Sequence, residues 1–234
     1  MGQIQNAIIM AAGKGMRLRP LTEKTPKPLL PIGDRTLIET VLDALTMTGV
    51  EKLYVVTGYL GDQFQILTNR YENLRLIRNP DYDAANNISS VYYAREVLRQ
   101  GACMICEADL YLRRPEILRE IPDHSCYYGM RKPGYSDDWV FDTGKDGYIT
   151  RVGKGGTDCY NMVGLSFFTK EDAAILSDCI QDAYSMEGLR DLFWDEVVDR
   201  NLKRLRLRIR PVEEGSITEI DTCEEYYALT STLK

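Results

Sequence analysis

The segment IMAAGKGMRLRPLTEKTPKPLL, residues 9–30, places a glycine-rich turn directly after an apolar run. The run itself, residues 7–10, is typical of a buried strand. Gly13 and Gly15 allow a tight turn and a close approach of the backbone to a ligand. Successive amide groups in such a turn bind anions. Basic side chains add positive charge to this region: Lys14, Arg17, Arg19, Lys24 and Lys27. The segment therefore predicts a strand that ends in a phosphate site suited to a triphosphate.

Two common phosphate-binding motifs do not match this segment. The Rossmann fingerprint requires a third glycine where Leu18 stands, and the Walker A sequence G-x-x-x-x-G-K-[ST] is absent. The pattern A-A-G-x-G-x-R-x-x-P-L-T, followed by T-P-K-P-L, instead resembles the signature of nucleotidyltransferases that make nucleotide-activated sugars and alcohols. The ordinary alternative is a glycine turn with solvated basic residues, and the length of the signature disfavours it.

The composition predicts a soluble, cytoplasmic protein. With 234 residues and 44% hydrophobic content, the chain can bury a substantial core, and we expect a single domain over residues 1–234. No apolar run approaches the length of a membrane span and no signal peptide is evident, so membrane insertion is not expected. The net charge of -6 argues against a nucleic-acid partner. The basic run at residues 203–210 alternates with apolar residues, which favours a strand with one solvated face.

Cysteine and histidine usage argues against metal or redox chemistry at those residue types. Cys103 and Cys106 have C-x-x-C spacing, but they lie in an apolar run and no second pair follows. We therefore expect buried thiols in a strand rather than a zinc or redox site. His124 is the only histidine, and nothing near it supports a nucleophile–base pair.

Apolar runs alternate with helical patterns through the first half of the chain. Strands are expected at residues 7–10, 53–57, 74–77 and 102–105, and helices at residues 37–46, 63–71 and 89–98. A capping box of Thr36 and Glu39 opens the first of these helices. Strand–helix alternation predicts an α/β fold with a mainly parallel sheet flanked by helices. Because parallel sheets bind ligands at the carboxyl ends of their strands, the glycine turn and residues 107–109 should share one crevice.

The second half predicts a smaller mixed α/β extension. Strands are expected at residues 127–130, 139–141, 162–168 and 205–209. Thr169 caps a helix that starts at Glu171, a further helix should cover residues 189–201, and Thr222 with Glu225 opens a last one. We find no internal repeat or linker.

Several segments outside the N-terminal signature point to a narrower family within the nucleotidyltransferases. They are residues 58–59, 85–90, 107–109, 138–139, 191–195 and 215–221. Together they resemble the bacterial CTP:phosphocholine cytidylyltransferases over nearly the whole chain. The resemblance implies a Rossmann-like fold of the nucleotide-diphospho-sugar transferase type, with the extension forming the acceptor side. It also implies Mg²⁺-dependent transfer of CMP from CTP to phosphocholine, with CDP-choline and pyrophosphate as products, by a monomer or homodimer.

Two aspartates are the candidate metal ligands. Mg²⁺ binds through one or two carboxylates together with phosphate oxygens and water. Asp109 follows an apolar strand, and Asp221 follows Ile220 far along the chain. Taken alone, Asp109 could start a turn and Asp221 could cap the final helix. The resemblance implies that this pair binds Mg²⁺ and that Lys27 and Arg17 act with it in catalysis, Lys27 on the phosphate oxygens of the transition state.

The same resemblance implies which residues contact the nucleotide. They are Ala11, Ala12, Gly13, Lys14, Gly15, Met16, Arg17, Lys27, Gly58, Tyr59, Asn87 and Ser90. Residues 13–17 would wrap the triphosphate, whereas Asn87 and Ser90 would lie near the cytidine. No general base is needed, because the attacking oxygen of a phosphate monoester is largely ionised at neutral pH.

The acceptor side can be argued from the chemistry of a quaternary ammonium. Such a group has no N–H donors, and aromatic faces with a nearby carboxylate hold it best. The resemblance assigns these positions to Trp139, Phe193 and Glu219, with Asp195 beside them. It also matches Lys154 to a lysine that contacts the phosphate of the acceptor. Core packing is the alternative role for Phe193, and a solvated turn is the alternative for Lys154.

One departure from the family leaves the acceptor open. Relatives often have tyrosine where Phe193 stands, and Asp137 and Asp138 add acidity before Trp139. More carboxylate and less hydroxyl could favour a primary ammonium. Phosphoethanolamine and 2-aminoethylphosphonate are therefore alternative acceptors. The chain has two other interpretations. It could be a sugar-1-phosphate nucleotidyltransferase, or a regulatory module without turnover.

Overall fold

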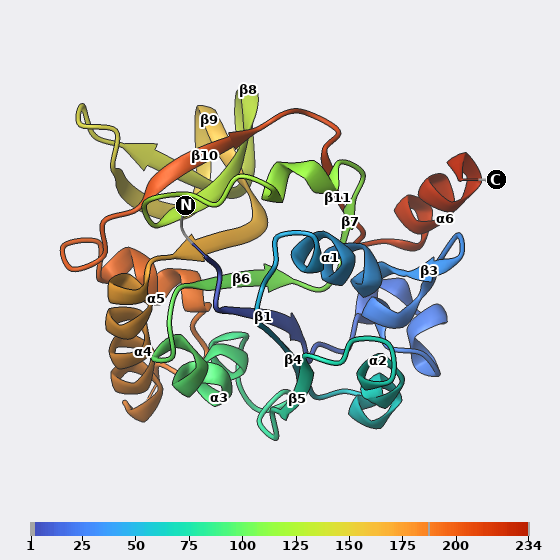
Figure 1. The fold of residues 1–234 in the computed structure, drawn as a ribbon. Coiled ribbons are helices and arrows are strands. Elements are labelled where there is room, and N and C mark those ends of the chain that lie inside the picture. Colours follow the sequence, from blue (N-terminus) through green and yellow to red (C-terminus); the bar gives the residue numbers. More distant parts are fainter. Residues whose placement is uncertain (1–2, 187, 234) are drawn as a thin grey trace.

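The computed structural model describes residues 3–186 and 188–233. Its centre is a seven-stranded sheet with the order β10-β8-β9-β6-β1-β4-β5 (Figure 1). The strands are β1 Asn6–Ala11, β4 Lys52–Thr57, β5 Leu74–Arg78, β6 Cys103–Glu107, β8 Cys126–Thr143, β9 Ile149–Phe168 and β10 Arg208–Val212. Strands β6, β1, β4 and β5 are parallel, whereas β9 runs antiparallel to both β6 and β8. The predicted α/β fold with a mainly parallel sheet is confirmed.

Helices and two small ribbons surround this sheet. The α-helices are α1 Leu37–Thr46, α2 Gln65–Thr68, α3 Ile88–Leu98, α4 Lys170–Ser185, α5 Trp194–Arg200 and α6 Cys223–Thr232. The 3₁₀ helices are η1 Met16–Leu18, η2 Leu21–Glu23, η3 Lys27–Leu29, η4 Gly61–Phe64 and η5 Pro115–Leu118. One ribbon pairs β2 Pro31–Ile32 with β3 Arg35–Thr36, and the other pairs β7 Leu110–Leu112 with β11 Ile217–Glu219.

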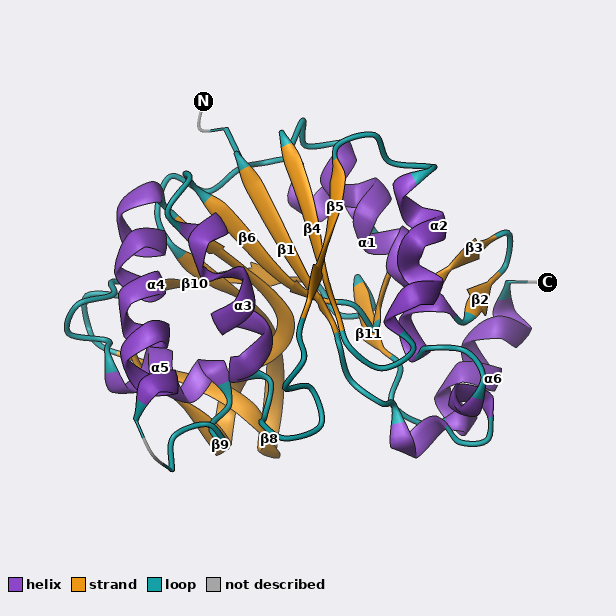
Figure 2. Ribbon diagram, turned by 90° about the horizontal axis from the view of Figure 1, so that it is seen from below, coloured by secondary structure: helices purple, strands orange, loops and turns teal. Residues whose placement is uncertain are grey.

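The alternation of side chains along β1 explains why helices cover both faces. Ile9 lies in the core cluster that includes α1, whereas Ile8 lies in the cluster that includes α3, α4 and α5. Successive residues of a strand point to opposite faces, so both neighbours are buried only if both faces are covered. Figure 2 shows α3, α4 and α5 grouped on one side of the sheet, apart from α1 and α2.

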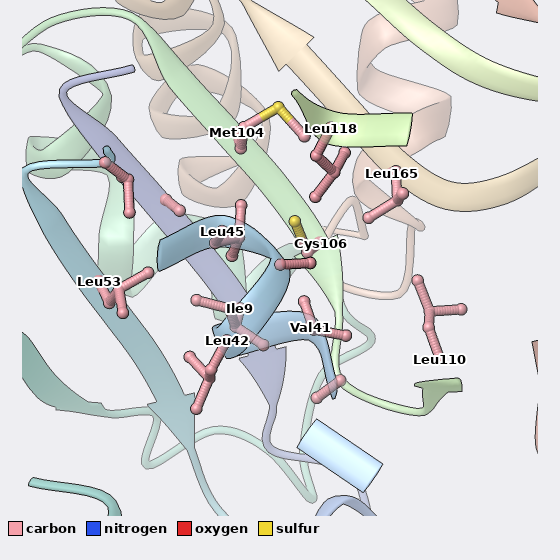
Figure 3. Packing of buried hydrophobic residues seen from close by; sticks show 14 of the residues in the cluster. Ile9, Val41, Leu42, Leu45, Leu53, Met104, Cys106, Leu110, Leu118 and Leu165 are labelled. Carbon is pink, nitrogen blue, oxygen red and sulfur yellow. The ribbon is translucent and has the colours of Figure 1, made fainter. Parts of the chain in front are cut away.

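Figure 3 shows the core on the α1 side, where Val41, Leu42 and Leu45 face Ile9 of β1. Cys106 belongs to the same cluster, whereas Cys103 packs into the cluster on the opposite face. Both thiols are buried, and they cannot converge on one metal ion because they point to opposite sides of β6. The prediction of buried strand cysteines is confirmed.

The capping residues read from the sequence set three helix starts. The carboxylate of Glu39 accepts from the Thr36 backbone N–H at 2.7 Å. The Thr169 hydroxyl accepts from the Asp172 amide at 3.3 Å, and the Thr222 hydroxyl accepts from the Glu225 amide at 3.2 Å. These bonds satisfy amide groups that have no partner within the helix. The predicted starts of α1, α4 and α6 are confirmed.

Two predicted helices are shorter in the structure. Residues 63–71 contribute only η4 and α2, because Leu60 turns the chain with a φ of 48° and only Phe64 and Leu67 are buried there. Residues 189–201 contribute only α5. The Glu196 carboxylate accepts from the Phe193 amide at 2.8 Å, which fixes the helix start after Phe193.

The extension forms one long hairpin instead of separate short strands. The segments predicted at 127–130 and 139–141 both belong to β8, and the segment at 162–168 is the end of β9. Shifts in register absorb the residues around Gly134, so the pairing continues past them. The strand predicted at 205–209 begins only at Arg208, although Leu205 and Leu207 are fully buried as the alternation indicated. No helix of the described residues is long and apolar enough to cross a membrane.

Candidate active site

A cleft of about 420 Å³ opens at the carboxyl ends of β1 and β6. Its lining joins the glycine turn, the loop before α3, the end of β6 and the β11 region. The residues are Met10, Ala11, Ala12, Gly13, Gly15, Met16, Arg17, Leu18, Lys27, Pro28, Asn79, Tyr82, Ala85, Asn86, Asn87, Ser89, Ser90, Glu107, Ala108, Asp109, Glu219 and Asp221. The glycine turn and residues 107–109 therefore share one crevice, as predicted.

The glycine turn is built so closely that Gly15 has no room for a side chain. Its φ is 59°, and an added Cβ would lie 3.0 Å from the Cβ of Lys27 and 3.1 Å from Thr22. The Thr22 hydroxyl donates to the Gly15 carbonyl at 2.8 Å. The glycine turn thus packs directly on the segment that carries Lys27. This contact sets the distance between the turn and the lysine.

Gly58 and Tyr59 pack against the backbone of the glycine turn. An added Cβ at Gly58 would lie 2.6 Å from Tyr82 and 2.8 Å from the Ala12 carbonyl. The Tyr59 amide donates to that carbonyl at 3.1 Å, and the Tyr59 hydroxyl donates to the Thr22 carbonyl at 3.0 Å. Neither residue lines the cleft. Their predicted place in nucleotide binding is therefore indirect in this structure.

Lys27 joins the two predicted aspartates. Its ammonium donates to Asp109 at 2.7 Å and to Asp221 at 2.8 Å, and only 9% of its side chain is exposed. The Arg17 guanidinium contacts the same oxygen of Asp221 at 2.7 Å. Although burial alone would lower the pKa of Lys27, its two carboxylate partners raise that pKa above its ordinary value. Burial would raise the pKa of Asp221, but Lys27 and Arg17 hold it below its ordinary value.

A third and a fourth carboxylate complete the acidic end of the cleft. Oxygens of Glu107, Asp109 and Glu219 all lie within 4.8 Å of one another. Burial, followed by the charge of Asp109, raises the pKa of Glu107 well above its ordinary value. Glu219 is more open to the cleft, yet partial loss of water and the charges of Asp109 and Asp221 raise its pKa to about 8. A cation that enters this site would relieve the repulsion between these carboxylates.

The donor set fits a divalent metal ion. The Oδ1 atom of Asp109 is buried and has no hydrogen-bond partner, although the Oδ2 atom binds Lys27. Carboxylate oxygens are the ligands that Mg²⁺ prefers. Asp221, the other predicted ligand, shares the Lys27 ammonium with Asp109, so the lysine bridges the predicted pair. Glu107 was expected in this crevice as part of residues 107–109, but the sequence did not assign it a role in metal binding.

The predicted nucleoside side is held by a hydrogen-bonded loop. Asn87 accepts from the Trp194 amide at 2.9 Å, and the Asn79 side chain donates to the Ser90 hydroxyl at 3.2 Å. Asn79 is buried and lines the cleft, and it was not predicted. Its position directly after β5 is the signal that could have revealed it. Lys14 does not line the cleft, because its ammonium pairs with Asp83.

The predicted acceptor side lies next to this cleft and is formed by three aromatic or basic residues. The ring centroids of Trp139 and Phe193 are 5.4 Å apart in an edge-to-face arrangement. The Lys154 ammonium lies 6.0 Å from the Trp139 ring and 5.8 Å from the Phe193 ring. Of the predicted acceptor residues, only Glu219 lines the main cleft.

Asp195 is buried in the core and is not at the surface of the acceptor side. It is 3% exposed, and the hydroxyl of the buried Tyr127 donates to it at 2.9 Å. Burial raises the pKa of Asp195 to about 7 despite this bond. Asp195 does not line the main cleft, and its contact with the acceptor stays a prediction. Trp194 is buried as well and stacks on Tyr127, whereas the neighbouring Phe193 stays half-exposed.

A profile of the MobA-like NTP transferase domain matches residues 7–135, which is more than half of the chain. The chain belongs to this family. The matched range includes the glycine turn, Lys27, Asn87 and Asp109, but it ends inside β8. The predicted nucleotide and metal residues up to Asp109 therefore lie within the matched range.

Several relatives that match nearly the whole chain are cytidylyltransferases. The 2-aminoethylphosphonate cytidylyltransferase of Lancefieldella rimae is 49% identical over 95% of this chain and 91% of the relative. The solved CTP:phosphocholine cytidylyltransferase of Streptococcus pneumoniae is 32% identical, covers 99% of this chain and 100% of its own, and superposes with a TM-score of 0.89. The inositol-1-phosphate CTP transferase of T. maritima shares the fold, with 19% identity and a TM-score of 0.77 over 100% of this chain and 97% of its own. The predicted likeness to phosphocholine cytidylyltransferases is confirmed.

The charges of the transferase suit nucleotidyl transfer. Nucleotidyl transfer builds negative charge on phosphate oxygens, and fixed positive groups stabilise that charge. Lys27 and Arg17 stand at one end of the glycine turn, where they already meet the carboxylates. A triphosphate that enters the cleft would compete with Asp109 and Asp221 for these two cations. Lys27 and Arg17 would thus pair either with Asp109 and Asp221 or with the phosphates of a nucleotide.

Proposed function

We propose that this protein transfers CMP from CTP to 2-aminoethylphosphonate, with release of pyrophosphate. A phosphonate oxygen attacks the α-phosphorus, and the bond from that phosphorus to the bridging oxygen of the β-phosphate breaks. The single observation that carries the proposal is the 49% identity to the 2-aminoethylphosphonate enzyme over nearly the full length of both chains. The identity to the phosphocholine enzyme is 32%. The comparison thus favours the alternative acceptor over phosphocholine, the first reading of the sequence.

The residues of the predicted acceptor side support an acceptor that carries a primary ammonium group. Such a group has three N–H donors and is bound best by several carboxylate oxygens. Glu219, a predicted acceptor residue that lines the cleft, lies at its acidic end, whereas Asp109, Asp221 and Glu107 are left for the metal ion. Phe193 offers a ring face without the hydroxyl that relatives often carry at this position. A sugar-1-phosphate acceptor, which needs hydroxyl recognition in place of charge, finds less support in these residues.

The predicted nucleotide and metal residues that line the cleft receive the following roles in this proposal. The glycine turn binds the triphosphate, with Arg17 and Lys27 neutralising phosphate charge, while Asn87 and Ser90 lie beside the nucleoside. Asp109 and Asp221, with Glu107 close by, would hold Mg²⁺. When bound, Mg²⁺ neutralises phosphate charge and orients the triphosphate. Binding both substrates in line makes the attack effectively intramolecular.

Pyrophosphate release over a panel of substrates tests the proposal. The panel crosses CTP, UTP, ATP and GTP with 2-aminoethylphosphonate, phosphoethanolamine, phosphocholine and glucose 1-phosphate, each with and without Mg²⁺. We expect the highest kcat/KM with CTP and 2-aminoethylphosphonate, and a product whose mass equals that of the CMP conjugate. A higher kcat/KM with phosphocholine, or turnover with the sugar phosphate alone, would overturn the assignment of the acceptor. Turnover that does not need a divalent metal would overturn the role of Mg²⁺.

A further inference from the structure

The Lys154 ammonium lies beside both rings of the Trp139–Phe193 pair. It is 6.0 Å from one ring centroid and 5.8 Å from the other, and the rings are 5.4 Å apart. These distances lie within the range in which a cation is attracted by the ring quadrupole. Throughout residues 3–186 and 188–233, no carboxylate lies within 4.0 Å of this ammonium. The aromatic pair is therefore the charged group's main partner.

The fold places Lys154 on the pair. Trp139 and Lys154 face each other across the β8–β9 hairpin. The backbone next to Lys154 is braced by Arg151, which donates to the Gly155 carbonyl at 2.9 Å and to the Lys154 carbonyl at 3.4 Å. Arg151 is itself held by Asp142. The position of the lysine thus follows from strand register and from the braced backbone of β9, because residues opposite each other on one strand pair have neighbouring side chains.

The aromatic pair adjoins the cleft through the start of α5. Phe193 directly precedes Trp194, whose amide donates to Asn87 in the cleft wall. The Asn86 side chain also donates to the Asp191 carbonyl at 3.1 Å. Figures 1 and 2 show α5 beside the β8–β9 hairpin, and the two elements are in contact. An acceptor that extends from the cleft toward the pair would meet the Lys154 ammonium there.

We propose that Lys154 determines acceptor specificity by occupying the aromatic pair as an internal cation, which disfavours acceptors with a quaternary ammonium. This inference rests on the proposed function. A quaternary ammonium depends on aromatic faces, so it must displace the lysine or lie close to a like charge. A primary ammonium does not depend on the rings, because carboxylates can accept its three N–H bonds. Lys154 therefore disfavours one class of acceptor and leaves the other unaffected.

Two acceptors that differ only at nitrogen give the cleanest test. We would measure kcat/KM with CTP for 2-aminoethylphosphonate and for its N,N,N-trimethyl derivative, so that all contacts to the phosphonate cancel in the ratio. In Lys154→Met, which keeps length but removes charge, the preference for the primary amine should fall about tenfold. Lys154→Arg should retain the preference, since a guanidinium also binds aromatic faces. Lys145→Met removes another exposed lysine of the same hairpin and should change nothing.

The outcomes separate this inference from the proposed function. If Lys154→Met lowers kcat/KM equally for both acceptors, the lysine serves the phosphonate that they share and the inference is wrong. An unchanged preference in the Met variant also overturns it. If the wild-type protein forms no CMP conjugate with either acceptor, the proposed function fails, and this inference fails with it. Circular dichroism of each variant checks that the hairpin is intact.

Discussion

The nucleotide side and the acceptor side of the cleft are built in different ways. On the nucleotide side, one short segment carries the glycine turn and Lys27, and its charges meet carboxylates at 2.7 and 2.8 Å. On the acceptor side, Trp139, Lys154 and Phe193 come from separate elements and meet at 5 to 6 Å through ring faces. Close ion pairs restrict substitution, whereas ring contacts tolerate it. We therefore expect substitutions to be tolerated less at the glycine turn and Lys27 than at Trp139, Lys154 and Phe193.

The largest effect is expected on the nucleotide side, for Asp109→Asn. This change removes a charge that Lys27 and a metal ion both need, while keeping the size of the side chain. We expect turnover to fall by about 10²–10³, as for the loss of one charged group that stabilises a transition state. Pyrophosphate release by the purified, folded variant measures it. Asp123→Asn, at a fully exposed carboxylate, is the matched control. A rate near that of the wild type would remove Asp109 from the catalytic site.

In the core, two residues after Phe193, we expect Asp195→Asn to change how the free energy of unfolding depends on pH. An unfolded aspartate has a pKa near 3.9, whereas burial raises the pKa of Asp195 to about 7 in the folded protein. Between these values the folded state holds a proton that the unfolded state has released. The contribution of this group to stability is therefore greatest at acid pH and is lost as pH rises toward 7.

The comparison of wild type with Asp195→Asn isolates that contribution. The free energy of unfolding of the wild type, relative to the variant, should fall by about 2 kcal/mol between pH 5 and pH 7. Denaturant titrations at both pH values measure it. Asp182→Asn, on the exposed face of α4, should show no such change. Parallel pH dependences of wild type and Asp195→Asn would contradict a raised pKa at this buried group.

A smaller effect concerns metal binding without nucleotide. Lys27 neutralises Asp109 and Asp221 in this structure, so it competes with a cation for them. In Lys27→Met the two carboxylates lose their partner, and Mn²⁺ should bind about tenfold more tightly in the absence of CTP. Electron paramagnetic resonance of free Mn²⁺ gives the affinity directly. Lys14→Met is the control, because that ammonium pairs with Asp83. Equal Mn²⁺ affinity in wild type and Lys27→Met would show that the lysine does not compete.

The smallest effect is expected on the acceptor side, for Trp139→Ala. Loss of one ring face should raise the KM for phosphocholine, whose quaternary ammonium depends on aromatic faces, about fivefold and leave the KM for CTP nearly unchanged. Steady-state kinetics with each substrate varied in turn give both values. Tyr135→Ala removes a 70% exposed aromatic side chain from the same hairpin and should leave both constants as they are. Equal changes in the two constants would place Trp139 outside the acceptor pocket.

The sequence predicted the nucleotide side well because its signals are local. The apolar run, the glycines and the capping residues each act within a few positions, so the strand β1, the turn and helix α1 follow from short-range rules. The shared crevice followed from one topological rule for parallel strands. Asn79 was missed because it looks like an ordinary strand-end residue until the sheet places it in the cleft, whereas Glu107 was expected in the crevice without a role of its own.

The acceptor side was predicted less completely because its geometry depends on long-range packing. Asp195 follows Phe193 by two positions, but the turn into α5 buries the aspartate and leaves the phenylalanine half-exposed. The hairpin was predicted as separate strands because Pro133 and Gly134 are typical of a turn, whereas pairing with β9 continues past them. Propensity alone does not reveal such pairing.

Lys27 and Asp221 form their ion pair although 194 residues separate them in the chain. The approach depends on β11 pairing with β7 and on α6 packing near Leu18 and Leu37. During synthesis, the glycine turn leaves the ribosome long before Asp221 does. Until β11 pairs with β7, Lys27 therefore lacks Asp221, one of its two carboxylate partners. The paired environment of Lys27 is thus acquired only after residues from both ends of the described structure have met.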